Sequence, residues 1–381
     1  MELSTIFKFI EKEIVGTDIP DRIAKDARLQ FGTETQPFWL AKYLPVENKE
    51  NNEIYEEITR IGTFIANDGS PLSPPQIKRS SEGLGLRVRL AHIDIATQMD
   101  ARDMRTLGRL LNQGDRAVAV QFVVNWITRT LRFSVEAKAE VQRAEAFCNA
   151  TVTITPMDGA SYLVQMPNPP GHRVTVPSGT AAAPTGWYSP TFDPIQETLV
   201  PIKLMMQAKG YEPMVIITSS RIAGALQMNP NVSQYGRGLI IQDGNLTTSS
   251  GIASDAQVNV VLQANGLPPM MRYDRFYQTQ TGSARFFPED KFLIIGATGR
   301  DAQIEVPDDR GRILRRELIQ NTLGYTGRGV SEGQTKPGAV VTVKTSDVKP
   351  VGVWGESYAE SFPVILDYEG VACVTVPALA A

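Results

Sequence analysis

The stretch DRAVAVQFVVNWITRTLRFSVEAKAEVQRAEAFC (Asp115–Cys148) decides the fold of this chain. It contains neither glycine nor proline, although the 381-residue chain holds 31 Gly and 25 Pro. A helix through all of it would be about 50 Å long at a rise of about 1.5 Å per residue, several times the length of an average globular helix. Asp115 is a residue type that favours the N-cap position. We therefore predict a rod-shaped helix around which the other segments are arranged.

The two halves of this stretch carry different signals. Val118–Ile127 is β-branched and apolar nearly all round, so that by itself it is equally compatible with a buried strand. In the second half, Arg132 and Glu136 stand at an i,i+4 offset and Glu140 and Arg143 at an i,i+3 offset, as in ion-paired helices. These pairs favour the helix, and the Trp-Phe-Val stripe indicates core packing more than a ligand site.

A short amphipathic helix is predicted at the N-terminus, where apolar residues recur at helical spacing: Leu3, Ile6, Phe7, Ile10 and Ile14. It could pack on the chain's own core, on a partner subunit or on a membrane, and its mixed-charge polar face makes the membrane the weakest of the three readings. Residues 16–54 show little periodicity. We predict that this segment is an extended arm that needs another surface to become ordered.

Two strands joined by a long irregular tip are predicted over residues 55–99. Tyr55–Ala66 and Leu86–Ile95 have strand patterns, and the apolar phase of the second strand changes between Leu90 and Ala91, which predicts a bulge or twist. The tip, Asn67–Gly85, is rich in Pro, Ser and Gly. Such long tips are usually functional or disordered, and this one is either a solvated flap or an arm laid across a neighbouring subunit.

The remaining segments predict a mixed α+β chain. Helices are expected at residues 100–112, 193–210 (begun by Asp193-Pro194 with Gln196 at N3 and kinked by Pro201), 219–228 and 255–265. Strands are expected at a 150–165 hairpin, at 214–218, 270–277 and 292–297, near Val340, and at 362–366 and 371–376. Residues 301–338 are polar and Gly-rich, without a predicted element.

Composition limits the class of protein. With 42% hydrophobic and 21% charged residues, the chain is typical of ordinary globular proteins. Its 381 residues exceed the size at which a single core stops growing, so we expect two or more sub-domains. Two cysteines cannot form a disulfide framework, and with no leader before Met1 we expect synthesis in a reducing cytoplasm. No apolar run is long enough for a membrane span. The net charge of −3 argues against a broad basic face that grips nucleic acid, but not against a protein that lies beside it.

The sequence contains no pattern that indicates a catalytic, cofactor or metal site. The two histidines, His92 and His172, are not at metal-ligand spacing, so we predict no metal site, no cofactor and no catalytic residue. Residues 83–85 and 327–329 (Gly-Leu-Gly and Gly-Arg-Gly) lack the third glycine of a dinucleotide fingerprint and are interpreted as loops. The acidic pairs at 289–290 and 308–309 are interpreted as turns.

The order of arm, long loop, rod helix, hairpin, α/β block and returning strands resembles the major capsid proteins of tailed bacteriophages, in particular the lambda-like branch with the Hong Kong 97-type capsid fold. The resemblance covers most of residues 55–376. The stretches that carry it are RAEAF (Arg143–Phe147), GWYSPTFDP (Gly186–Pro194), GYEP (Gly210–Pro213), YDRFY (Tyr273–Tyr277) and FPEDKFLII (Phe287–Ile295).

The resemblance implies an α+β structural shell protein that assembles as pentamers and hexamers into an icosahedral phage head enclosing double-stranded DNA. Its parts would be an N-terminal arm (1–54), an extended β-hairpin loop (55–99), a peripheral domain with spine helix and hairpin (100–185), an axial domain (186–335) and C-terminal strands returning to the peripheral domain (336–381). The candidate subunit-interface residues are Phe64, Pro71, Lys78, Arg79, Arg87 and Arg89.

The implied partners are many copies of the chain itself, a portal, and packaged DNA held without sequence specificity, with room for a decoration protein and no membrane. No long charged helical segment precedes the arm, which implies a separate scaffolding protein. Lys78 lies where self-cross-linking relatives carry a lysine, and a cross-link would need an Asn acceptor on a neighbour; the favoured interpretation is a solvated lysine or a contact to a decoration protein. The implied location is the virion, after synthesis in the host cytoplasm. Two alternatives stay open: an encapsulin-like nanocompartment shell, and an α/β enzyme built on residues 186–300.

Overall fold

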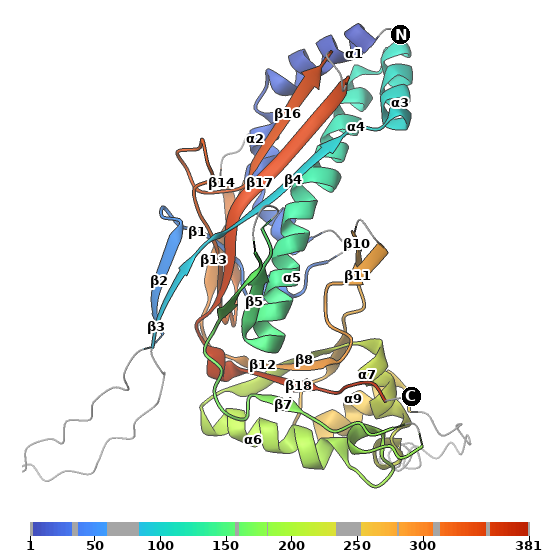
Figure 1. Cartoon of the computed structure of the whole chain (residues 1–381), viewed down its shortest axis with the longest axis vertical. Helices are drawn as coiled ribbons and strands as arrows, with labels where there is room; N and C mark the ends of the chain where they lie inside the picture. The colour runs from blue at the N-terminus through green and yellow to red at the C-terminus, as the bar shows by residue number, and fades with distance from the viewer. Residues whose placement is uncertain are drawn as a thin grey trace, which may run out of the picture.

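A continuous helical rod runs along the upper part of the molecule (Figure 1). In this computed structural model, residues 3–32, 37–58, 84–156, 160–180, 182–233, 253–279, 282–307, 313–347 and 351–379 are described. The rod consists of α4 (Arg116–Trp126), a π-helical segment (Ile127–Arg132) and α5 (Phe133–Asn149), of 11, 6 and 17 residues. We call it the spine helix, and it confirms the prediction. Asp115 occupies the N-cap position, but its side chain makes no capping hydrogen bond.

One long strand, β17 (Gly352–Ile365), lies beside the spine helix and is the centre of a five-stranded sheet. Its partners are β16 (Val340–Ser346), β15 (Gly324–Arg328) and β4 (Ala91–Gln98), all antiparallel to it, and β1 (Val46–Asn48) pairs in parallel with β15. The sequence predicted only residues 362–366 as strand, which is wrong about the length. The N-terminal part of β17 contains Gly and Glu, residue types that are depleted in strands, and its neighbours on both edges keep it extended.

Several short helices cover the end of this sheet that is uppermost in Figure 1. Helix α1 (Leu3–Ile10), the π-helical turn Glu11–Val15, α2 (Ile19–Lys25) and α3 (Ala101–Asn112) lie there together (Figure 1). The apolar face of α1 is buried with residues of α3, α4, β16 and β17 in one cluster. Of the three readings for this helix, packing on the chain's own core is therefore the one observed.

The prediction that residues 16–54 need another surface is wrong for the described part of that segment. Phe38, Leu40 and Leu44 are buried within the chain's own core. The backbone N–H of Leu40 donates to a carboxylate oxygen of Glu140 at 2.9 Å. Periodicity gave no sign of this because the segment packs through irregular turns, not through one face of a helix or strand.

The second predicted strand is confirmed with its change of phase. β2 (Glu53–Ile58) and β3 (Leu84–Arg89) form an antiparallel pair, and a break at Leu90 separates β3 from β4. Leu90 and Ala91 are both buried, and the N–H of Leu90 donates to the Asn52 carbonyl at 2.9 Å. The break lets one continuous segment leave the β2–β3 pair and join β17.

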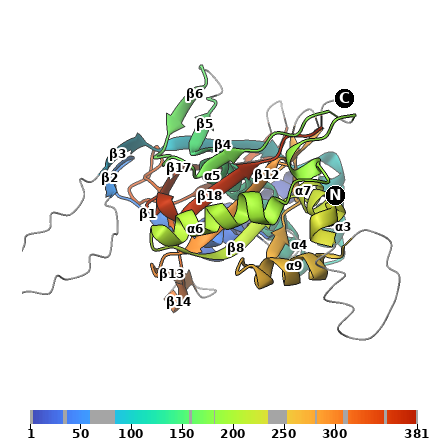
Figure 2. The ribbon, with the colours of Figure 1, turned by 90° about the horizontal axis from the view of Figure 1, so that it is seen from below.

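The lower part of the molecule is a second α/β layer that lies across the end of the spine helix (Figures 1 and 2). Its sheet has the order β7 (Arg173–Thr175), β18 (Val371–Thr375), β12 (Lys291–Ala297), β8 (Glu212–Thr218) and β9 (Met270–Arg272). Its helices are α6 (Val200–Ala208), α7 (Ser220–Met228) and α9 (Asp255–Ala264). The end of α5 packs on β18 and β12 in a core shared by both parts.

The start of the helix that leads into α6 differs in detail from its prediction. The Asp193 carboxylate accepts from the N–H groups of Ile195 (2.9 Å) and Gln196 (3.2 Å), which confirms the cap. Glu197, not Gln196, reaches back to the N–H of Asp193, at 3.0 Å. A π-helical turn, Ile195–Leu199, stands directly before α6, and the helix continues through Pro201, the second residue of α6.

Three two-stranded ribbons complete the described fold: β5 (Thr151–Ile154) with β6 (Tyr162–Gln165), β10 (Phe276–Thr279) with β11 (Gly282–Arg285), and β13 (Ala302–Pro307) with β14 (Ile313–Ile319). The first confirms the predicted hairpin. β13, β14 and β15 lie in 301–338, where the sequence predicted no element.

Candidate functional site

The two histidines have structural partners. His92 Nδ1 lies 2.6 Å from Glu360 Oε1. His172 is buried, its Nδ1 lies 2.8 Å from the Val371 carbonyl, and burial lowers its pKa. Within the described ranges, no group of His, Cys, Asp or Glu is arranged to hold a metal ion. No helix in those ranges is long and apolar enough to cross a membrane.

The Gly-Arg-Gly motif at 327–329 is not the loop that the sequence analysis expected. Gly327 is part of the buried strand β15, and a Cβ atom on it would lie 2.5 Å from the Ile54 side chain. A Cβ atom on Gly329 would lie 2.2 Å from the Asn52 side chain. Both glycines therefore permit the close approach of the segment around Asn52. The Asp308-Asp309 pair lies outside the described residues, as does Gly83.

A buried ion network crosses the spine helix. Glu136 Oε1 accepts from Arg328 Nη1 at 2.7 Å and also from Arg132 Nη1, and all three side chains are almost fully buried. Burial alone would raise the pKa of Glu136, but the guanidinium groups of Arg132 and Arg328 together hold that pKa well below its usual value. The ion pair between Glu136 and Arg328 therefore joins the spine helix to β15, a strand of the five-stranded sheet.

One turn further along the helix, Glu140 forms a second junction. Its Oε1 accepts from the N–H of Leu40 and from the Tyr273 hydroxyl, both at 2.9 Å, and its Oε2 accepts from Arg143 Nη1 at 3.2 Å. Burial raises the pKa of Glu140 in spite of these partners. Arg143 Nε in turn donates to Thr326 Oγ1 at 2.9 Å. The sequence predicted the two pairs within the helix, but nothing local could indicate Leu40, Tyr273 or Thr326.

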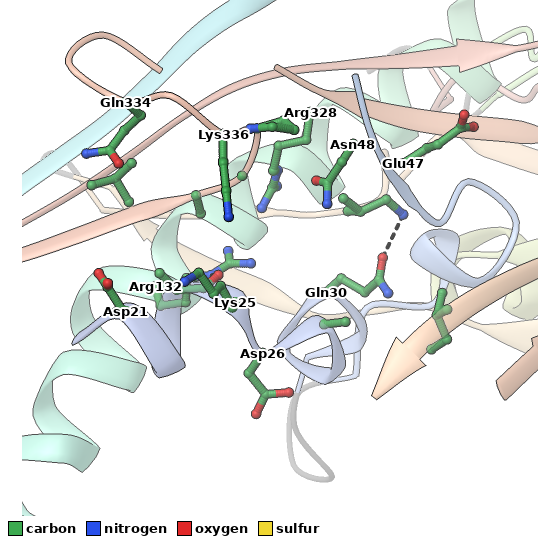
Figure 3. A pocket seen from close by; sticks show the side chains of 18 of the residues that line it. Asp21, Lys25, Asp26, Gln30, Glu47, Asn48, Arg132, Arg328, Gln334 and Lys336 are labelled. Carbon is green, nitrogen blue, oxygen red and sulfur yellow. Dashed lines mark hydrogen bonds between the residues drawn. The ribbon is translucent and has the colours of Figure 1, made fainter. Parts of the chain in front are cut away.

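A cavity of about 460 Å³ opens beside the first junction. Four cationic side chains line it (Figure 3): Arg132 from the spine helix, Arg328 from β15, Lys25 from α2 and Lys336 from the segment before β16. The polar residues Gln30 and Asn48, among others, complete the lining. Sequence reasoning missed this site because its residues come from α2, the spine helix, β15 and the segment before β16.

Of the six predicted interface residues, only Arg87 and Arg89 are described. Both are exposed on β3, whose other face (Leu86 and Val88) is buried in the core. Arg87 Nη2 lies 2.7 Å from Glu53 Oε2, and Tyr55, opposite Arg87 in the register, is 73% exposed. The β2–β3 pair thus presents a polar face with one large aromatic ring. The other four predicted residues, Phe64, Pro71, Lys78 and Arg79, lie outside the described residues.

A second exposed surface was not predicted from the sequence. Strand β6 exposes Tyr162 and Leu163, the latter at 56% of its surface, although β5 buries Val152 and Ile154 in the core. Because successive side chains of a strand point to opposite faces, these two residues leave one large side chain exposed on each face of the hairpin.

No protein-family model matches this sequence, and no curated protein does. Solved structures do match. A protein from a prophage of E. coli CFT073, assigned as a capsid protein, superimposes with a TM-score of 0.51 at 12% identity, covering 99% of each chain. A phage-related protein of Bordetella bronchiseptica RB50 gives a TM-score of 0.49 at 12% identity, over 92% of this chain and 95% of that one. The SrpI encapsulin of Synechococcus elongatus gives 0.37 at 12% identity, over 90% and 88%.

The similarity to the E. coli prophage protein, at a TM-score of 0.51 and 12% identity, indicates a common fold. It extends over 99% of both chains, so it concerns the fold as a whole and not one part of it. The chain has the fold of phage capsid proteins, the Hong Kong 97-type fold that the sequence predicted.

Proposed function

We propose that this chain is the major capsid protein of a tailed phage, a structural subunit that assembles as pentamers and hexamers into an icosahedral shell around double-stranded DNA. The observation that carries the proposal is the fold shared with a prophage capsid protein over 99% of both chains. In this proposal the upper part, with the spine helix, is the peripheral domain. The lower α/β layer is the axial domain around the five-fold and six-fold axes.

The two exposed surfaces support repeated contacts between copies. Closed rings are built from heterologous contacts, in which two different surfaces of each subunit meet. The β2–β3 face and the exposed side chains of β6, Tyr162 and Leu163, are two different surfaces of this kind, and the proposal assigns both to subunit interfaces. Burial of apolar surface stabilises by about 25 cal/mol per Å². Modest contacts therefore suffice when every subunit touches many neighbours.

The buried ion network suits the same role. The Glu136 and Glu140 junctions join three distant segments of the chain, at Leu40, Tyr273 and β15, to one helix. Truncating one partner of such a network leaves a buried charge without its counter-ion, which is strongly destabilising. The network therefore favours a single rigid subunit shape.

The proposed partners are copies of the chain, a separate scaffolding protein, a portal, a decoration protein and the packaged DNA. The net charge of −3 supports a container that does not grip DNA, since a basic lining would hold the phosphates through counter-ion release. The virion is the proposed location of the assembled protein. A structural, non-catalytic role is part of the same proposal.

Electron microscopy and sedimentation of the purified chain test this proposal. Expression alone and together with a scaffolding protein from the same genome should yield closed icosahedral shells or their pentamers and hexamers. A monodisperse monomer under both conditions would contradict it. Shells that retain a specific protein cargo and package no DNA would favour the encapsulin-like alternative instead.

A further inference from the structure

Arg328, which lines the cavity beside Glu136, has a buried donor edge without a hydrogen-bond partner among the described residues. Arg328 is 1% exposed, and its Nη1 donates to Glu136 at 2.7 Å. Its Nε and Nη2 have no hydrogen-bond partner among the described residues. These two atoms form the side edge of the guanidinium, which is the edge that binds two oxygens of one anion. An unmatched buried donor is costly, so an acceptor is expected at this place.

The charges around this edge have the same sign. Lys25, Lys336 and Arg132 line the cavity together with Arg328 (Figure 3). The carboxylate that pairs with the two arginines is Glu136, which is already shared between them. Positive charge therefore exceeds negative charge inside the cavity.

The acidic residues of the lining do not offset this excess. Asp26 pairs with Arg28 at 2.9 Å and Glu47 pairs with Lys49 at 2.9 Å. Figure 3 shows both carboxylates, and that of Asp21, turned away from the lysines and arginines. The charge of Asp26 still stabilises the Arg132 guanidinium from a distance.

We infer that this cavity is an oxyanion-binding site for a phosphate or carboxylate group. Two oxygens of the anion would accept from the Arg328 edge, while Lys25 and Lys336 close over it from the mouth. The group could come from free phosphate or from an acidic side chain of a second copy of this chain. The inference goes beyond the proposed function and does not depend on it.

Calorimetric titration of inorganic phosphate into the dilute, unassembled protein at constant ionic strength tests the site. We expect saturable binding of one phosphate per chain. The double variant Lys25→Gln/Lys336→Gln should weaken that binding at least tenfold. Both lysines are exposed, so the fold should be unaffected, which circular dichroism checks. The control Lys42→Gln/Lys138→Gln removes the same charge from exposed positions away from the cavity and should bind as the parent chain does.

Three outcomes would overturn the site: no saturable binding, equal weakening in both double variants, or undiminished binding in Lys25→Gln/Lys336→Gln. A second arm distinguishes the sources. Phosphate binding that persists in the assembled protein identifies the free anion as the occupant. Binding present in subunits but lost on assembly identifies a carboxylate from a neighbouring copy.

Discussion

The substitution Glu136→Gln should destabilise this protein severely. Glu136 is fully buried and accepts charge-assisted hydrogen bonds from two buried arginines, Arg132 and Arg328. Hydrogen bonds to charged groups contribute about 1.5–3 kcal/mol each. Breaking a buried ion pair by removing one partner costs about 3–5 kcal/mol, because the other charge stays buried. We expect a loss in the free energy of unfolding of about 3–5 kcal/mol, a large fraction of the 5–15 kcal/mol typical of native proteins.

Urea unfolding followed by far-ultraviolet circular dichroism and tryptophan fluorescence measures this loss. With a slope of about 3 kcal/mol per M, the midpoint should fall by about 1–2 M. Glu53→Gln is the matched control, because Glu53 pairs with Arg87 at 2.7 Å but both side chains are solvent-exposed. That variant should unfold like the parent chain. An unchanged midpoint for Glu136→Gln, or an equal loss in the two variants, would refute the reasoning.

The pH dependence provides a second readout of the same carboxylate. The arginines hold the folded-state pKa of Glu136 below its ordinary value of 4.5. A carboxylate with a lowered folded-state pKa stabilises the protein above the unfolded-state pKa, and this contribution is lost as the pH falls toward the folded-state value. The difference in stability between the parent chain and Glu136→Gln should therefore be constant near neutral pH and shrink below about pH 4.5. A difference that grows on acidification would contradict the assignment.

Two further substitutions test packing and assembly. Gly355→Ala would place a Cβ atom 2.4 Å from Leu131 and 2.9 Å from Trp126 of the spine helix, and such overpacking should lower the free energy of unfolding by about 1–3 kcal/mol in urea titrations. Gly224→Ala, in a helix with nothing within 4 Å of the new atom, is its control and should be neutral or stabilising by up to about 1 kcal/mol. Leu163→Ser should leave the thermal unfolding of the subunit unchanged but reduce the yield of shells by sedimentation, whereas undiminished assembly would remove β6 from the proposed interface.

Local signals identified the elements whose stabilising contacts are close in sequence. The spine helix was predicted because Arg132–Glu136 and Glu140–Arg143 lie one turn apart, and these contacts are present in the structure. The cap at Asp193 was predicted because its acceptors and donors lie within four residues of it. The change of strand phase at Leu90 was visible in the alternation of apolar residues.

Most of the candidate site could not be predicted in this way. Glu136 and Arg328 are 192 residues apart, and Leu40 and Glu140 are 100 apart. At such separations in the sequence, no local pattern indicates that a glutamate and an arginine form an ion pair, because only the folded sheet places β15 beside the spine helix. The Gly-Arg-Gly motif was therefore interpreted as a loop, although its glycines admit the neighbouring segment and its arginine lines the cavity.

The sequence by itself determined the spine helix, the N-terminal amphipathic helix, the hairpin at 150–165 and the α+β class, because helix periodicity, caps and turns depend on residues only a few positions apart. Tertiary structure alone decided the 14-residue length of β17, the strands within 301–338, the burial of residues 38–44 and the pairing of the buried charges. In each of these, polar or poorly strand-forming residues become stable only when distant segments supply their hydrogen bonds and exclude water.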